Sequence, residues 1–115
     1  MDQRKKELKE QYKLNRPDMG ILAVTCLANG KRLLLSTPNL KGMENRIRFQ
    51  LGMGSFPNRE LQRDWLEYGE ENFKIEVLDI LPYSTDESKT DYRDDLEELR
   101  AMWVEKLRQE QVMLY

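Results

Sequence analysis

The chain has 115 residues, a length that suits one domain and leaves no room for a second hydrophobic core. It has no histidine and a single cysteine, Cys26. These counts exclude a Ser-His or Cys-His nucleophile pair, an imidazole general base, a histidine or thiolate zinc site and an internal disulfide. No apolar run approaches the ~18 residues of a membrane span, and the first residues lack the apolar stretch of a signal peptide. We therefore expect a cytoplasmic protein of a reducing compartment, without a membrane partner.

The charge is nearly balanced, with 19 Lys and Arg against 21 Asp and Glu and a net charge of −2. The two halves of the chain differ, however. Residues 1–63 hold 13 basic and 6 acidic side chains, whereas residues 64–115 hold 6 basic and 15 acidic ones. A basic first half favours a surface that faces phosphate in a protein with an acidic pI. The alternative is that both halves are solvated helix faces.

The chain begins with a charged segment that favours a helix. Residues 3–14 carry few apolar side chains among many charged ones, and the helix they predict ends before Pro17, because the residue that precedes a proline disfavours helical backbone. We therefore expect residues 1–17 to form a charged helical extension. The domain itself then spans residues 18–115.

A β-hairpin is expected next. Residues 20–27 form a mostly apolar run with β-branched members, which predicts a buried strand. Asn29-Gly30 follows this run, and both residues tolerate positive φ, so the pair is a strong hairpin signal. The partner strand is expected over residues 32–36.

Helical spacing marks three further segments. After Asn39, which suits a helix N-cap, apolar residues recur on one helical face at Leu40, Met43, Ile47 and Leu51. A second helix is expected between Asn58 and Gly69. The last helix is expected over residues 92–110, with one apolar stripe at Leu96, Leu99, Trp103 and Leu107.

A third strand is expected over residues 73–80, between the last two helices. Phe73, Ile75, Val77 and Asp79 are expected on one face of this strand, because they alternate with the residues between them. The order of elements predicts an α/β domain of the mixed α+β type. Its core is a three-stranded antiparallel sheet flanked by helices.

This element order, together with particular residues, resembles the GIY-YIG nuclease domain over roughly residues 18–107. Residues 20–22 read Gly-Ile-Leu where the family has Gly-Ile-Tyr, and residues 33–35 read Leu-Leu-Leu where it has Tyr-Ile-Gly. The Asn-Gly-Lys turn at residues 29–31 matches the usual turn of the family. The strongest local match, over residues 61–78, is to the homing-endonuclease branch.

The resemblance implies a nuclease that uses one divalent metal held by a Glu, with two Tyr, an Arg and often a His around the phosphate. This chain differs at each of the five positions, which hold Leu22, Leu33, Met43, Ile47 and Arg100. Leucine has no hydroxyl to relay a proton. Met43 cannot neutralise charge on a phosphate, and the positive Arg100 would repel Mg²⁺. We therefore expect no catalytic residue, no metal and no cofactor, and no enzymatic activity.

Two outcomes are open for the substituted cleft. Its apolar residues either close into ordinary core, or line an apolar groove that binds a protein partner, a second copy of the chain or a small apolar ligand. Separately, seven basic residues form a candidate cluster for DNA or RNA phosphates: Lys31, Arg32, Lys41, Arg46, Arg48, Arg59 and Arg63. A solvated face is the alternative for this cluster.

The sequence therefore predicts a catalytically inactive GIY-YIG nuclease-like domain that acts as a nucleic-acid- or protein-binding module. One alternative is a self-associating structural or regulatory domain that uses the apolar former cleft. The other is a residual divalent-metal-dependent DNA endonuclease, in which a shifted register lets Asp94, Glu97 or Glu98 hold the metal.

Overall fold

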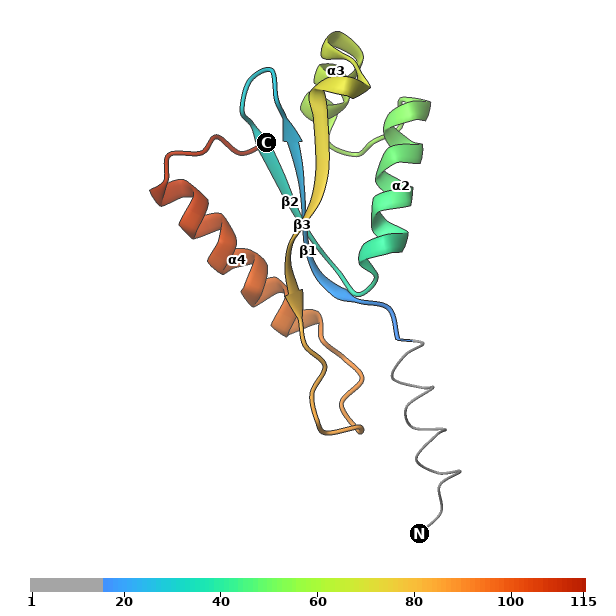
Figure 1. Cartoon of the computed structure of the whole chain (residues 1–115), viewed down its shortest axis with the longest axis vertical. Helices are drawn as coiled ribbons and strands as arrows, with labels where there is room; N and C mark the ends of the chain where they lie inside the picture. The colour runs from blue at the N-terminus through green and yellow to red at the C-terminus, as the bar shows by residue number, and fades with distance from the viewer. Residues whose placement is uncertain (1–15) are drawn as a thin grey trace.

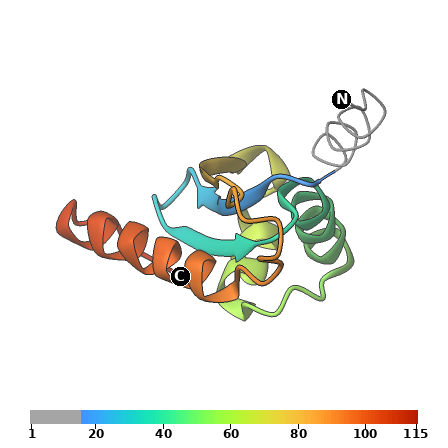
Figure 2. The same ribbon diagram turned by 90° about the horizontal axis from the view of Figure 1, so that it is seen from below.

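The computed structural model describes residues 16–115, in which a three-stranded sheet carries helices on both faces (Figures 1 and 2). The elements are β1 (Met19–Cys26), β2 (Arg32–Thr37), α2 (Leu40–Met53), α3 (Arg59–Tyr68), the 3₁₀ turn η1 (Glu70–Asn72), β3 (Phe73–Leu81) and α4 (Arg93–Gln109). The predicted fold class is confirmed. The helix expected over residues 3–14 lies outside the described residues. From residue 16 onward, every helix is too short or too polar to cross a bilayer.

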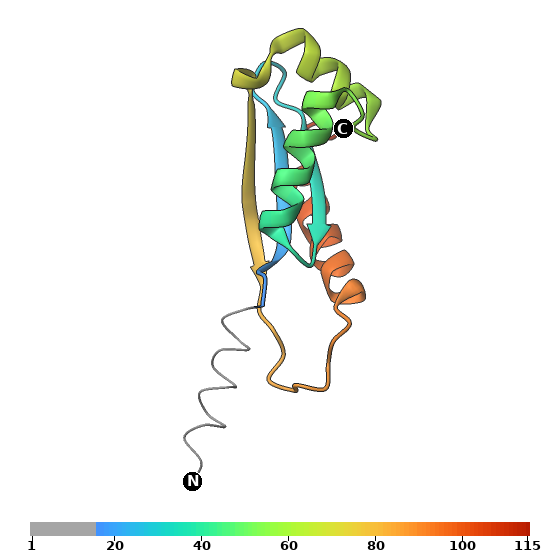
Figure 3. The ribbon, with the colours of Figure 1, turned by 90° about the vertical axis from the view of Figure 1, so that its right-hand side faces the viewer.

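Strand β1 is the middle strand, and both of its neighbours run antiparallel to it, in the order β2-β1-β3. Leu22 and Val24 face a core cluster shared with α2 and α3, whereas Ile21 and Ala23 face the cluster under α4. Helix α2 runs along the sheet and α3 lies near the β1–β2 hairpin (Figures 1 and 3). A strand covered on both faces favours apolar residues along its whole length, which explains the mostly apolar run in the sequence, where Thr25 is the one polar side chain.

Local signals set the ends of several elements. The hairpin turns at Gly30, which has a φ of 75° and donates from its backbone N–H to the Cys26 carbonyl at 2.8 Å. The Asn39 side chain caps α2, and the Asn58 side chain accepts a hydrogen bond from a backbone N–H in the first turn of α3. Gly54 ends α2 in the left-handed conformation.

Strand β3 departs from the expected alternation at a β-bulge. The register pairs Leu22 with Val77 but the preceding Ile21 with Asp79, so Leu78 is an extra residue. The expectation that Asp79 shares a face with Val77 is therefore wrong. One inserted residue shifts the pleat, and every later side chain of the strand changes face.

Asp79, next to the bulge, bonds to α4 through its side chain, and its backbone lies close to β1. Its Oδ2 accepts a hydrogen bond from Trp103 Nε1 of α4 at 3.0 Å. On β1, a Cβ atom added to Gly20 would lie 2.0 Å from the Asp79 carbonyl oxygen, closer than any real contact. The two backbones thus approach so closely that only glycine fits at position 20. This requirement is structural, and it applies whether or not the domain has catalytic residues.

Replacing Gly20 with alanine should lower the free energy of unfolding by about 2–3 kcal/mol, because β1 and β3 have to move apart to admit the Cβ. Gly52→Ala in α2 is the matched control. A Cβ there meets nothing within 4 Å, and alanine should stabilise the helix by roughly 0.5–1 kcal/mol. Urea unfolding followed by circular dichroism measures both variants. An unchanged midpoint for Gly20→Ala would contradict the close approach.

Candidate functional site

The four apolar residues at the substituted positions lie together on the α2 side of the sheet. Leu22 and Ile47 are 0% and 1% exposed and belong to the main core cluster. Leu33 of the edge strand and Met43 of α2 are half-buried and pack against this cluster. Two of the four positions are therefore closed core, while the other two border solvent.

Leu33 and Met43 line a hollow of about 320 Å³ between β2 and α2, which we call the β2–α2 hollow. Leu35, Ile47, Phe56 and Pro57 complete its apolar wall, and its polar members are Arg46, Gln50 and Asn58. The two outcomes expected from the sequence, closed core and open groove, thus occur in different parts of the same region. Leu22 lies in the closed part and does not line the hollow.

Arg100 approaches the edge strand β2 from the α4 side of the sheet. It is carried by α4, on the face of the sheet opposite α2, where its Nε donates to the Leu34 carbonyl at 2.9 Å and its Nη1 to Glu97 at 3.3 Å. Because β2 is an edge strand, a carbonyl that points away from β1 needs such a partner. Leu33 and Arg100 line one hollow at the β2 edge, although α2 and α4 cover opposite faces of the sheet. The Arg100 side chain ties α4 to the edge of the sheet.

The residues around Arg100 do not fit the divalent metal that the resemblance implies. Mg²⁺ requires several hard oxygen ligands, whereas Arg100 brings a fixed positive charge and engages the Glu97 carboxylate. Asp94 and Glu98, the other carboxylates considered from the sequence, are exposed on α4. Over residues 16–115, no three Asp, Glu or Cys side chains converge in a way that could hold a metal ion.

The seven basic residues expected to contact phosphate divide into paired and unpaired side chains. Lys31 forms an ion pair with Glu60, whose hydrogen bond raises the pKa of Lys31, and Arg48 pairs with Glu44 at 3.3 Å. The side chains of the other five have no hydrogen-bonded or ion-pair partner among the described residues. They are Arg32, Lys41, Arg46, Arg59 and Arg63.

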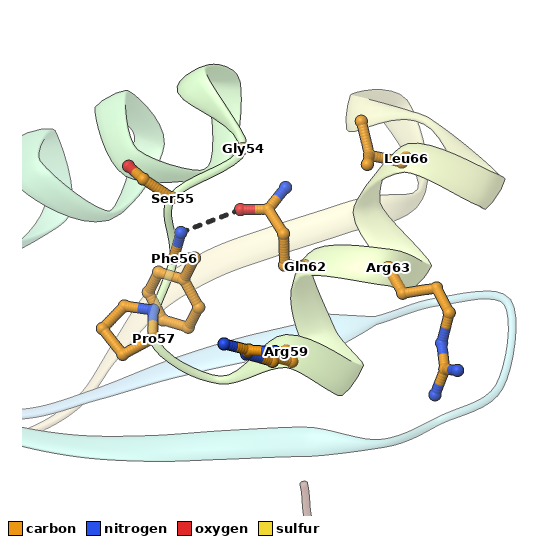
Figure 4. A pocket seen from close by; sticks show the side chains of 8 residues that line it. All are labelled: Gly54, Ser55, Phe56, Pro57, Arg59, Gln62, Arg63 and Leu66. Carbon is orange, nitrogen blue, oxygen red and sulfur yellow. Dashed lines mark hydrogen bonds between the residues drawn. The ribbon is translucent and has the colours of Figure 1, made fainter.

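Three of the five unpaired residues surround adjoining hollows. Arg46 borders the β2–α2 hollow, while Arg59 and Arg63, one turn apart on α3, border a second hollow of about 530 Å³ at the α2–α3 loop (Figure 4). We call this second hollow the loop hollow. Phe56 and Pro57 line both hollows, and neither lining includes an Asp or Glu. The charged side chains that line the two adjoining hollows are therefore all arginines.

Arg32 and Lys41 lie outside these two hollows. Lys41 lines a different hollow at the start of α2, and Arg32 lines a hollow against α4 together with Arg100. The single basic cluster expected from the sequence is thus reduced to the three arginines Arg46, Arg59 and Arg63.

Gln62 holds the α2–α3 loop that separates the two hollows. Its Oε1 accepts a hydrogen bond from the Phe56 backbone N–H at 3.0 Å, drawn as a dashed line in Figure 4, and its Nε2 donates to the Leu51 carbonyl at 3.0 Å. The side chain is only 8% exposed. The sequence interpretation did not single out Gln62, because a glutamine on a helix carries no signal of its partners until the path of the loop is known.

Comparison with known proteins supports the fold. No protein-family model matches the sequence, and no curated protein matches it. The fold is similar to the catalytic domain of the homing endonuclease I-TevI, with a TM-score of 0.66 over 83% of this chain and 94% of that chain, at 21% identity. A mutant of the catalytic domain of the intron endonuclease I-TevI aligns with a TM-score of 0.65 over 84% and 90% of the two chains, also at 21% identity. The chain therefore has the fold of a GIY-YIG domain, and the fold expected from the resemblance is confirmed.

Tyrosine introduced at the two positions where the family has it should separate their structural roles. Leu22→Tyr should lower the free energy of unfolding by about 2–3 kcal/mol, because the larger ring and its hydroxyl enter a fully buried space. Leu33→Tyr is the control, and we expect a change below about 1 kcal/mol because the hydroxyl can reach solvent at the hollow. Urea unfolding measures both, and equal losses would show that the two positions do not differ in burial.

Proposed function

We propose that this domain is a nucleic-acid-binding module on a nuclease-like fold, without nuclease activity. The observation that carries the proposal is the set of three unpaired arginines, Arg46, Arg59 and Arg63, around two adjoining hollows without an acidic lining residue. Guanidinium groups form charge-assisted hydrogen bonds with phosphate oxygens. Because the nearby Lys31 and Arg48 are already paired with carboxylates, the three arginines are the side chains left for phosphate in this region.

The proposed loss of catalysis rests on side-chain chemistry at the substituted positions. Leu22 is sealed in the core, so neither a water nor a substrate reaches it. Met43 carries no charge to stabilise a transition state, and Arg100 already donates to a backbone carbonyl and to Glu97. Losing one electrostatic group of this kind costs about 10²–10³ in rate, and several are changed here together.

A protein partner, or a second copy of the chain, is the second candidate. The observation that favours it is the exposed apolar surface of the two helices near the hollows. Phe49 and Met53, one turn apart on α2, are each 68% exposed, and Leu66 on α3 is also exposed. Apolar side chains gathered in this way often mark protein interfaces. Sedimentation velocity over a range of concentrations tests this candidate, because self-association would raise the measured mass.

Binding of DNA should be strongly dependent on salt. Fluorescence anisotropy with a labelled oligonucleotide should show an affinity that falls steeply between about 50 and 200 mM salt. The reason is that arginine contacts with phosphates release counterions from the nucleic acid. The double variant Arg59→Gln/Arg63→Gln should weaken binding and reduce the salt slope by about one for each arginine that contacts a phosphate. Arg93→Gln is the control, since Arg93, the first residue of α4, is exposed and pairs with Asp91 of the preceding loop. Equal weakening by both changes would contradict a specific role for the α3 arginines.

Nicking of supercoiled plasmid should stay at the background level with Mg²⁺ or Mn²⁺, because the substituted positions supply neither a proton relay nor a metal ligand. The control is the Glu98→Gln variant, which removes the carboxylate that a shifted register would use. Cleavage that requires the metal and disappears in Glu98→Gln would contradict the proposed absence of nuclease activity and would support the residual endonuclease.

A further inference from the structure

The β2–α2 hollow has the size and wall of a site for one flat apolar ring. Its volume of about 320 Å³ lies at the lower end of the ~300–1,000 Å³ that small-molecule sites occupy. Leu33 and Leu35 of β2 form one side, and Met43 of α2 forms the other. A methionine wall adapts to ring shape and makes favourable contacts with aromatic groups.

Two side chains on α2 provide polar groups at this hollow. Arg46 and Gln50 are one turn apart, and both line it. The Arg46 guanidinium has no acidic partner in residues 16–115, and the Gln50 side-chain amide bonds to no described residue, whereas its backbone carbonyl accepts from Ser55 at 2.9 Å. A primary amide offers a donor and an acceptor side by side, which matches the edge of a nucleobase. A guanidinium matches a phosphate.

The loop hollow extends this pattern along the surface. Phe56 and Pro57 separate the two hollows, and Arg59 and Arg63 lie beyond them. A polymer that alternates flat rings with anionic groups fits this arrangement. One ring would enter the β2–α2 hollow, and the anionic groups would lie against the arginines. A base inside a duplex has its faces stacked and its edge paired, so it enters a hollow only after unstacking, whereas an unpaired base is already free.

We infer that the β2–α2 hollow binds one unpaired nucleobase of a single-stranded nucleic acid, whose phosphates contact Arg46, Arg59 and Arg63. This inference rests on the proposed nucleic-acid-binding function and specifies the form of nucleic acid that is preferred. Charge complementarity supports a polyanion here, since no Asp or Glu lines either hollow. An acidic peptide with one aromatic side chain is the competing occupant, and the experiment below separates it.

The experiment uses the full chain, a single-stranded DNA with one 2-aminopurine, the matching RNA, and a blunt duplex of the same sequence, all at one salt concentration. We expect the single strands to bind about tenfold more tightly than the duplex, and the fluorescence of the bound 2-aminopurine to change. Comparing DNA with RNA identifies which sugar is preferred. A preference for the duplex, or equal affinity for duplex and single strand, would overturn the inference.

Met43→Trp tests the hollow directly by filling it. This variant should lower single-strand affinity about tenfold and abolish the 2-aminopurine response, while duplex affinity stays within twofold. Met53→Trp is the matched control on the same helix, since Met53 is exposed and lines neither hollow, and it should leave both affinities unchanged. If Met43→Trp fails to fold by circular dichroism, Gln50→Ala replaces it, and we expect that variant to weaken single-strand binding alone.

The outcomes separate this inference from the proposed function. If Met43→Trp leaves the salt-dependent binding of single strand and duplex intact, the base site is wrong and the proposed function stands. Absence of binding to any nucleic acid at low salt would overturn both. If Met43→Trp instead weakens only the binding of an acidic, tyrosine-containing peptide, the hollow is a peptide site and the inference is wrong.

Discussion

Strand β1 has no side that faces solvent, and this constraint shapes the rest of the domain. It hydrogen-bonds to a neighbour along each edge and is covered by α2 and α3 on one face and by α4 on the other. All eight of its residues are buried, so each side chain has to be apolar or small enough to be accommodated. Leucine suits position 22, because a tyrosine hydroxyl buried there without a hydrogen-bond partner would lower the stability. Gly20 follows from the bulge opposite, where the β3 backbone comes too close for any Cβ.

The four apolar residues on the α2 side of the sheet are divided between the core and an open hollow. The inner positions, Leu22 and Ile47, join the core, and full burial of such a side chain contributes about 1.5–3 kcal/mol. The outer positions, Leu33 and Met43, keep a hollow open because β2 is the edge of the sheet and no further strand covers it. The charged side chains that line this hollow and the neighbouring loop hollow are Arg46, Arg59 and Arg63.

The outer edge of β2 is protected by contacts from distant parts of the chain. Arg100 donates to the Leu34 carbonyl, and the final residues pair with the start of the strand, where the Arg32 N–H donates to the Met113 carbonyl at 3.0 Å. The Tyr115 hydroxyl then donates to Asp64 at 2.7 Å, and burial together with this hydrogen bond raises the pKa of the phenol. Covering an edge strand in this way limits its pairing with other molecules.

Signals within a few residues were sufficient to predict most of the secondary structure. Asn29-Gly30 specifies a turn through its own backbone preferences, and Asn39 and Asn58 cap helices by bonding to N–H groups in the next turn, so neither depends on the rest of the fold. The apolar and basic residue types at the substituted positions were likewise evident from the sequence alone. Tertiary structure decided the bulge at Leu78 and the side of the sheet that Arg100 occupies. Each of these features depends on a partner that is distant in sequence. Such a contact is defined only when the strands and helices have packed, so the residue type alone does not predict it.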